Sequence, residues 1–235
     1  MEQQGMTTKH SREACLFCEI HERPVSELEW YDRPIVDVPG IGLAVAGLGA
    51  PVPGYVLVAP AIHVSSSRFL PHQLAVYFVN FIKEVQQLVE STYGPTTLFE
   101  HGSCANSETR RSACIEHCHL HIVPGKYSLE ALDLDVRRFR CLEDFIRDAS
   151  FDRGYLMYQE PSGAVCCSRD LGVSQYFRRQ IARTLGRPEE WDYAVFPNWP
   201  NVRQTCQWLT TRSSRAEADR GGPRPLSIWS ARPVL

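Results

Sequence analysis

The chain has 235 residues, 43% hydrophobic and 22% charged, which is ordinary for a soluble globular protein of one large domain or one domain with an extension. Its net charge of −2 argues against non-specific binding to nucleic acid or to an acidic membrane, so any phosphate site has to be local. No apolar run is long enough to span a membrane, and the polar stretch Met1–His10 lacks the apolar core of a signal peptide.

Nine cysteines in a chain of this kind predict a cytoplasmic location, where cysteines stay reduced and serve as buried thiols or metal ligands. The first chemical feature is the pair Cys15 and Cys18, spaced Cys-x-x-Cys. This spacing lets two thiolates reach one tetrahedral metal ion, and it is also the spacing of redox motifs. The pair alone is weak evidence for zinc, because a structural zinc site usually takes four ligands. The other two have to come from further along the chain.

The first half of the chain predicts short strands and one long helix. Apolar residues at helical spacing from Gln73 to Tyr93 indicate the helix, and Gly94-Pro95 ends it. The run Gly54–Pro60 is short, apolar and rich in β-branched residues, which is typical of a buried central strand, and it leads to His63. Further strands are expected over 30–38, 41–46 and 96–100, followed by a polar loop over 101–115.

The stretch His117–Pro124 carries three histidines at alternate positions. Side chains alternate between the faces of a β-strand, so His117, His119 and His121 are expected on one side and the residues between them in the core. Each imidazole can act as nucleophile, acid, base or metal ligand near neutral pH. The alternative is a solvated strand face or adventitious metal binding.

The second half predicts a mixed α and β segment. Short helices and a hairpin follow Pro124, with the hairpin turning at Pro161-Ser162-Gly163. Residues 211–235 are rich in Arg, Ser, Gly and Pro and are expected to be disordered. The helices are expected over 142–149, 174–185 and 201–209, and the hairpin strands over 155–159 and 164–168.

Four features of the sequence belong together: the Cys-x-x-Cys pair, the apolar strand leading to His63, the long helix and the alternating histidines. In combination they resemble the histidine-triad (HIT) superfamily of nucleotide hydrolases and transferases. The motif of this family is His-φ-His-φ-His-φ-φ, in which φ is an apolar residue. The segment Gly54–His63 is similar to the family's Gly-His-x-Leu-Val-x-Pro-x-x-His. The resemblance implies an α+β domain, with an antiparallel sheet packed on one long helix, commonly in a homodimer. The predicted organisation is a flexible N-terminus over 1–14, the histidine-triad domain over 15–125, an additional α+β extension over 126–210 and a tail over 211–235.

The resemblance also implies a metal site. Family members with an N-terminal Cys-x-x-Cys bind zinc through both thiols, the histidine after the central strand and the first histidine of the triad. Carried onto this chain, the ligands are Cys15, Cys18, His63 and His117. Four nitrogen and sulfur ligands close a tetrahedral site and leave no position for an activated water, so the zinc is expected to be structural.

In the family the middle histidine is the nucleophile, which here is His119. Its imidazole attacks the α-phosphorus of a nucleotide and forms a nucleotidyl-histidine, which water or another acceptor then resolves. A neutral nucleophilic nitrogen requires an acceptor for the other ring N–H, and the backbone carbonyl of His117 is a candidate. His121 is expected on the same face, where it binds or polarises phosphate oxygens.

The phosphoryl oxygens also need hydrogen-bond donors. The polar loop before the triad offers several, and Arg110 or Arg111 could pair with phosphate in bidentate fashion. The same loop could equally be a solvated surface loop, and His101 at its start could be an additional acid–base group or a structural histidine. The candidate donors are Ser103, Asn106, Ser107, Arg110, Arg111 and Ser112.

Two departures from the family pattern affect the substrate. Alignment on His63 puts Gly47 where many members carry an acidic residue that binds ribose hydroxyls, so ordinary ribose recognition is in doubt. The segment after residue 125 is the larger departure. It could be a lid or a wall that selects the leaving group, with Arg178, Arg179 or Trp191 available for this role, or it could be a dimer surface.

Three functions follow from these residues. The first is a nucleotide hydrolase that releases a nucleoside monophosphate from a dinucleoside polyphosphate or a nucleoside phosphoramidate. The second is a nucleotidyltransferase or phosphorylase that passes the nucleotidyl group to phosphate, a sugar or a metabolite. The third is a non-catalytic nucleotide-binding protein held together by zinc. The sequence does not reveal the base, the leaving group or the acceptor.

Overall fold

The computed structural model describes residues 15–103, 116–128, 136–148, 154–161 and 163–218, and its fold is α+β. Eight strands form one antiparallel sheet in the order β1-β2-β3-β5-β4-β7-β8-β6. The predicted α+β class, with an antiparallel sheet and a long helix, is thus confirmed. The strands are β1 (Val36–Val38), β2 (Gly42–Ala46), β3 (Val56–Pro60), β4 (Thr96–Gly102), β5 (Leu120–Pro124), β6 (Arg137–Phe139), β7 (Tyr155–Gln159) and β8 (Val165–Arg169).

The helices vary widely in length, and α3 is the long helix that the sequence predicts. Its buried face includes Phe78, Phe81 and Ile82, and it contacts β2, β3, β4 and β5. Gly94 ends α3 with a φ of +82°, a left-handed conformation that favours glycine. The helices are α2 (Leu16–Glu22), α3 (His72–Tyr93), α4 (Leu142–Arg147), α5 (Tyr176–Thr184) and α6 (Trp199–Ala218), with short 3₁₀ turns η1 (Val25–Glu27) and η2 (Ser67–Phe69).

Several elements differ from the sequence prediction. The strand expected over 30–38 begins only at Val36, because Pro34 lacks an N–H donor and turns occupy the preceding residues. Helix α2, only 7 residues long, and strand β6 were not predicted. Both are too short to establish a hydrophobic period, and β6 carries two exposed arginines, Arg137 and Arg138.

The sheet continues across the domain boundary predicted at residue 125. Strand β4 pairs with β5 on one side and with β7 on the other, so that Leu98 lies opposite both Ile122 and Gln159. The segment after Pro124 therefore adds three strands, β6, β7 and β8, to the sheet that carries the histidines. The predicted domain limits themselves remain a prediction.

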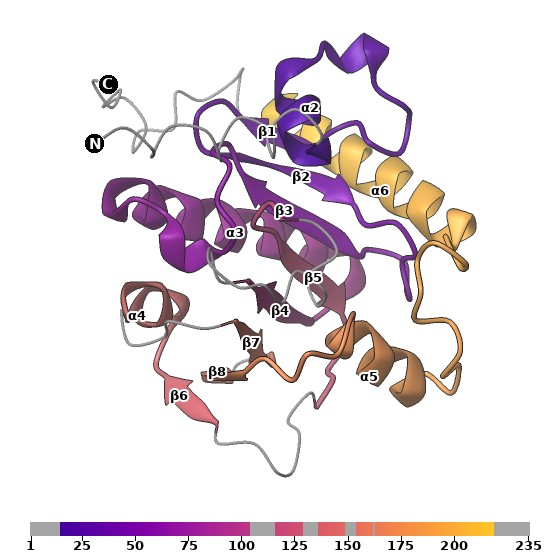
Figure 1. Ribbon diagram of the computed structural model, residues 1–235. Coiled ribbons are helices and arrows are strands. Elements are labelled where there is room, and N and C mark those ends of the chain that lie inside the picture. The colour runs from indigo at the N-terminus through magenta and orange to yellow at the C-terminus, as the bar shows by residue number, and fades with distance from the viewer. Residues whose placement is uncertain (1–14, 104–115, 129–135, 149–153, 162, 219–235) are drawn as a thin grey trace, which may run out of the picture.

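Helix α6 returns to the N-terminal half of the fold, where it packs against α3 and contacts β2 (Figure 1). Thr205 Oγ1 accepts a hydrogen bond of 2.8 Å from the backbone N–H of Gly54, and the ring of Trp199 lies 5.7 Å from that of Trp30. The helix is longer than the expected 201–209 and reaches Ala218, because neither glycine nor proline interrupts residues 201–218.

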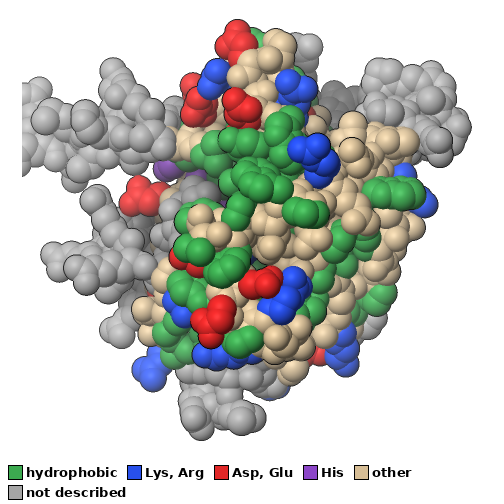
Figure 2. All heavy atoms as spheres, turned by 90° about the vertical axis from the view of Figure 1, so that its right-hand side faces the viewer, with side chains coloured by type: hydrophobic (Ala, Val, Ile, Leu, Met, Phe, Trp, Pro, Cys, Tyr) green, Lys and Arg blue, Asp and Glu red, His purple; other side chains and the backbone are tan. Residues whose placement is uncertain are grey.

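Figure 2 shows hydrophobic side chains gathered on one face of the molecule, with charged side chains around them. Among the residues with large exposed apolar side chains are Trp199 and Trp208, both on α6. Within the described part of the chain, no helix has both the length and the apolar character that crossing a membrane requires.

Candidate metal centre and active site

The structure brings together the four side chains predicted to bind zinc. Their ligand atoms, from Cys15, Cys18, His63 and His117, all lie within 4.8 Å of one another. Nδ1 of His117 is 3.4 Å from Sγ of Cys15 and 3.6 Å from Sγ of Cys18. Bond lengths of about 2.3 Å for Zn–S and 2.0 Å for Zn–N place tetrahedral ligands roughly 3.3–3.8 Å apart, so these residues fit a zinc ion.

Two local features orient the ligands. Cys15 immediately precedes α2 and Cys18 lies in its first turn, so the spacing of three residues puts both thiols on the same side of the helix. Nε2 of His117 lies 2.9 Å from the carbonyl oxygen of Pro60. A carbonyl only accepts, so Nε2 carries the proton and Nδ1 presents its lone pair to the thiols. Burial lowers the pKa of His117 to about 4, which favours the neutral, metal-binding imidazole.

The other two triad histidines line a cavity of about 300 Å³ between α2, strands β2 to β5 and the segment around α5. Only His121 of the three lies within β5, which begins at Leu120. His117 and His119 occupy the irregular stretch before it, so the expected single strand face is only partly formed. The result is a division of the triad, with His117 in the metal cluster and His119 and His121 in the cavity.

His119 has the tautomer that a nucleophile requires. Its Nδ1 lies 2.8 Å from the backbone carbonyl oxygen of His117, so Nδ1 carries the proton and donates it to this acceptor. The lone pair therefore resides on Nε2. Burial lowers the pKa of His119, and the nearby His101 acts in the same direction, which keeps the ring neutral near pH 7.

His121 is held as a hydrogen-bond donor. The Tyr55 hydroxyl is hydrogen-bonded to Nδ1 of His121, and the same hydroxyl accepts a bond of 3.3 Å from Nη1 of Arg178. Since the guanidinium can only donate, the hydroxyl keeps its own proton for Nδ1 of His121, and on this basis we assign the imidazole proton to Nε2. The ring stacks on Phe99 at a centroid distance of 4.2 Å and an interplanar angle of 9°. Burial, together with His119 and Arg178, holds the pKa of His121 well below its usual value.

Arg178, from α5, is the most unusual group in the cavity wall. Its side chain is buried, and its Nη2 donates to the carbonyl oxygen of Gly49 at 2.7 Å and its Nε to that of Trp191 at 2.9 Å. Across the described ranges, no carboxylate forms an ion pair with it. A buried cation without a counter-ion favours an anionic ligand in the adjoining cavity. Of the candidates for a wall, the structure thus places Arg178 at the cavity but not Arg179 or Trp191, which pack on each other.

The predicted phosphate loop is described only at its start. Ser103 Oγ donates to the carbonyl oxygen of Ser65 at 3.2 Å, and Ser103 does not line the cavity. Asn106, Ser107, Arg110, Arg111 and Ser112 lie outside the described residues. Their role as phosphate donors remains a prediction.

Packing explains why residue 47, at which the family pattern has an acidic residue, is a glycine in this chain. A Cβ built on Gly47 would lie 2.3 Å from the ring of Tyr55, so a side chain at 47 is incompatible with tyrosine at 55. Tyr55 occupies the position of the histidine in the family's Gly-His pair. Tyr55 was not among the predicted site residues, although this difference from the family pattern was visible in the sequence. Among the described residues of the cavity wall, Asp32 is the acidic one, and burial raises the pKa of its carboxyl group.

No protein-family profile matches the chain, and no curated protein does. Two solved structures are similar in fold at low sequence identity. One is a Hit-like protein involved in cell-cycle regulation from Bartonella henselae with unknown ligand, at 14% identity, covering 48% of this chain and 79% of that one, with a TM-score of 0.39. The other is a hypothetical histidine triad nucleotide-binding protein from Sulfolobus tokodaii, at 17% identity, covering 83% and 93%, with a TM-score of 0.36.

Proposed function

We propose that this chain is a histidine-triad protein that hydrolyses nucleotides at the α-phosphate through a covalent nucleotidyl-His119 intermediate. The observation that carries the proposal is the hydrogen bond from Nδ1 of His119 to the backbone carbonyl oxygen of His117. This bond leaves the Nε2 lone pair for attack, in a cavity that also contains a neutral donor, His121, and a buried cation, Arg178.

In the proposed reaction the Nε2 lone pair of His119 attacks the α-phosphorus and the leaving group departs. The Nε2–H of His121 donates to a phosphoryl oxygen, and the positive charge of Arg178 favours the extra negative charge of the transition state. Water then attacks the phosphorus, the P–N bond breaks, and a nucleoside monophosphate is released. A nucleotidyltransferase or phosphorylase would share the first step and differ only in the acceptor.

The remaining cavity wall supports a nucleotide as ligand. Leu16, Phe17 and Ile20 from the α2 region and Val45 from β2 give an apolar surface on which a base can pack. Asp32, on the same wall, is the candidate for the ribose hydroxyls in place of the acid that Gly47 replaces. Both assignments are parts of the proposal.

The zinc is proposed as a structural ion held by Cys15, Cys18, His63 and His117. When bound, it would cross-link the start of α2 to the stretch that precedes β5, and this stretch includes the carbonyl that orients His119. The buried ring of Phe17, from α2, lies 5.4 Å from the ring of His117 and 5.5 Å from that of His119, so it packs against the same stretch. The metal centre therefore supports the nucleophile without taking part in the reaction.

The experiment that tests the proposed function is mass-spectrometric detection of nucleoside monophosphate released from a mixed panel of nucleotides. The panel contains dinucleoside polyphosphates, nucleoside phosphoramidates and nucleotide sugars, with and without added phosphate. Release by the wild type and not by His119→Ala supports the proposal. A nucleoside diphosphate formed only with phosphate would identify a phosphorylase, and tight nucleotide binding without any product would identify a binding protein.

Tyr55→Phe should lower kcat about 10- to 100-fold and leave the fold intact. Without the hydroxyl, Nδ1 of His121 loses its donor, and the ring is no longer held in the tautomer with a proton on Nε2. Initial rates on the best substrate of the panel measure the effect. Tyr93→Phe is the matched control, because the buried Tyr93 hydroxyl has no hydrogen-bond partner among the described residues and Tyr93 does not line the cavity. Equal activity of the two variants would contradict the assigned role.

The homodimer and the cytoplasmic location remain predictions. Sedimentation equilibrium of the full chain measures the first, and microscopy of the tagged protein measures the second. Neither is needed for the chemistry proposed for His119.

A further inference from the structure

We propose that His101, oriented by Asp170, is the general acid–base residue of this site and serves substrates with a basic leaving atom. The inference rests on the proposed function, because it assigns the proton transfers that the nucleotidyl chemistry of His119 requires. It also gives a catalytic task to the chain segment after residue 125, which contributes Asp170.

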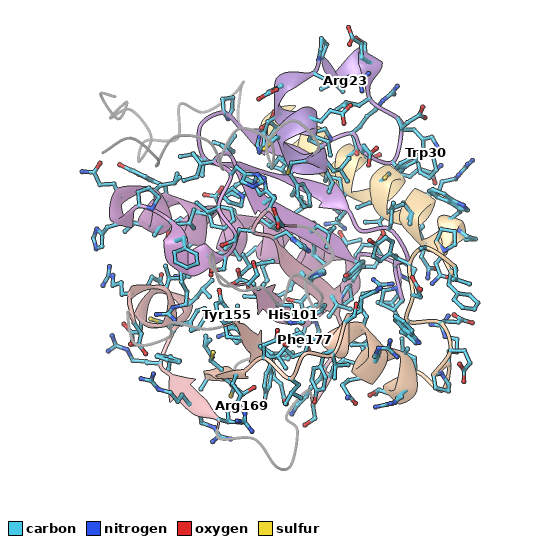
Figure 3. The ribbon with its side chains drawn as sticks, in the orientation of Figure 1. Arg23, Trp30, His101, Tyr155, Arg169 and Phe177 are labelled. Atoms are coloured by element: carbon cyan, nitrogen blue, oxygen red, sulfur yellow. The ribbon has the colours of Figure 1, made fainter. Side chains whose placement is uncertain are left out.

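The strand register places His101 beside the nucleophile. Phe99 of β4 lies opposite His121 of β5 in an antiparallel pair. His101 follows two residues later in β4, and His119 lies two residues before His121 in the stretch that leads into β5, so both side chains come to the same cavity. His101 lines the same cavity as His119 and His121, and electrostatically it acts on both of them. In Figure 3 its label lies just below the centre of the view, in the same region as that of Phe177 of α5, which also lines the cavity.

Asp170 fixes the tautomer of His101. Nε2 of His101 lies 2.9 Å from Oδ1 of Asp170, and the two side chains are only 11% and 16% exposed. The aspartate is itself held, because Oδ1 accepts from the backbone N–H of Gly172 at 3.0 Å and its own N–H donates to the carbonyl oxygen of Gly154 at 2.9 Å. A carboxylate accepts, so the proton is on Nε2, and Nδ1 is the atom left to exchange a proton.

The other two imidazoles of the cavity are not available for this task. His119 donates its Nδ1 proton to the carbonyl oxygen of His117 and uses Nε2 for attack. His121 accepts from Tyr55 at Nδ1 and offers its Nε2 proton to phosphate. Among the residues that the structure describes, the titratable groups that face His101 are Asp170 from the end of β8 and His119 and His121 from the region of β5. His101 is left as the imidazole whose second nitrogen has no other assignment.

Nδ1 of His101 loses a proton in the first step of the reaction and regains one in the second. In the first, the bond from Nε2 of His119 to phosphorus forms, the bond to the leaving atom breaks, and protonated Nδ1 gives its proton to the leaving atom. In the second, a water oxygen attacks phosphorus, the P–N bond breaks, and Nδ1 takes the proton of the water. An amine or an alkoxide needs the proton in the first step, whereas a p-nitrophenolate leaves without it.

The test compares two substrates of one nucleoside monophosphate, its p-nitrophenyl ester and its alkyl phosphoramidate, in wild type and His101→Gln. We expect kcat/KM for the phosphoramidate to fall at least about 100-fold and that for the p-nitrophenyl ester less than about 10-fold. A histidine that only braces β4 against β8 would lower both rates alike. Equal losses, or no loss with either substrate, would overturn the inference.

Asp170→Asn is a second variant that preserves the size of the side chain. Its amide can donate to Nε2 and so favours the proton on Nδ1, the wrong tautomer for accepting a proton. We expect the same selective loss with the phosphoramidate, with the melting temperature and metal content of the wild type as the check on folding. An equal loss of kcat/KM with both substrates, or no loss, would contradict the roles assigned to His101 and Asp170. His72→Gln, exposed at the start of α3, is the matched control and should not alter either rate.

The p-nitrophenyl ester separates failure of the inference from failure of the proposed function. Wild-type release of p-nitrophenolate that requires His119 supports the nucleotidyl chemistry, whatever His101→Gln does. If the wild type releases no product from either substrate, both the proposed function for this nucleotide class and the role of His101 are rejected.

Discussion

His119→Ala should lower turnover at least about 10³-fold and leave the fold and the bound metal unchanged. The substitution removes the attacking Nε2 atom. The metal ligands and the Tyr55 partner of His121 remain in place, because His119 is not one of the four ligands and its own side-chain hydrogen bond, among the described residues, goes to the backbone of His117. Single-turnover release of nucleoside monophosphate measures the effect. Trapping of a phosphorus-linked histidine by mass spectrometry at short times should succeed with the wild type only.

His72→Ala is the control for this variant, since His72 is exposed at the start of α3 and lies outside the cavity wall. Its activity should equal that of the wild type. Turnover retained by His119→Ala would mean that the nucleophile is misassigned. Loss of activity together with loss of metal or of the melting transition would mean that His119 has a structural role.

The purified chain should contain about one zinc ion per molecule, and Cys18→Ala should lose it. Without the metal, one thiol and two imidazoles remain packed against one another in the protein interior, so we expect the free energy of unfolding to fall by at least about 3 kcal/mol. For a chain of this size, that corresponds to a fall in melting temperature of roughly 6–12 °C. Elemental analysis and thermal unfolding with and without a chelator measure both quantities.

Cys206→Ala is the control for the metal ligand, because Cys206 is a partly buried free cysteine of α6 outside the cluster. It should keep the zinc and change the melting temperature by only a few degrees. A wild type that holds no zinc, with Cys15 and Cys18 freely alkylated in the folded state, would reject the site. Catalytic activity should also fall in Cys18→Ala, because the carbonyl that orients His119 belongs to a metal ligand.

The segment after residue 125 completes the cavity in this fold. It supplies the cation of Arg178, the ring of Phe177 and the carboxylate of Asp170, which contact Tyr55, Phe99 and His101 respectively. Of the roles that the sequence predicts for this segment, we therefore propose the wall that selects the leaving group. The proton transfer assigned to His101 is the means of that selection. Its alternative role as a dimer surface remains a prediction that none of these contacts addresses.

Much of the fold was predictable because its signals are local. The long helix was predicted within one residue at its start, since seven of its 22 residues form one buried apolar face. The central strand was predicted from a short β-branched run, and the hairpin strands from the turn signal Pro161-Ser162-Gly163 between them. The elements that escaped prediction, α2 and β6, are too short to carry a period, and their conformations depend on what packs against them.

The chemistry at the centre of the site was also visible in the sequence. Alternating histidines and a Cys-x-x-Cys pair have fixed spacings, and those spacings alone imply that the side chains can share a metal or a cavity. What the spacing could not decide was the division of labour, with His117 turned to the metal cluster because Pro60 accepts its Nε2 proton. That acceptor lies 57 positions away along the chain.

By itself, the sequence determined which residues could attack phosphorus and bind a metal, because these capacities belong to the side chains and to their local spacing. For His101, His117 and His121, the tertiary structure alone decided which tautomer the imidazole holds and which groups surround it. Arg178 reaches Tyr55 across 123 positions, and Asp170 reaches His101 across 69. Such contacts follow from the pairing of β4 with β7 and from the docking of α5 on the sheet, and no local pattern encodes a partner that only long-range packing brings within hydrogen-bond distance.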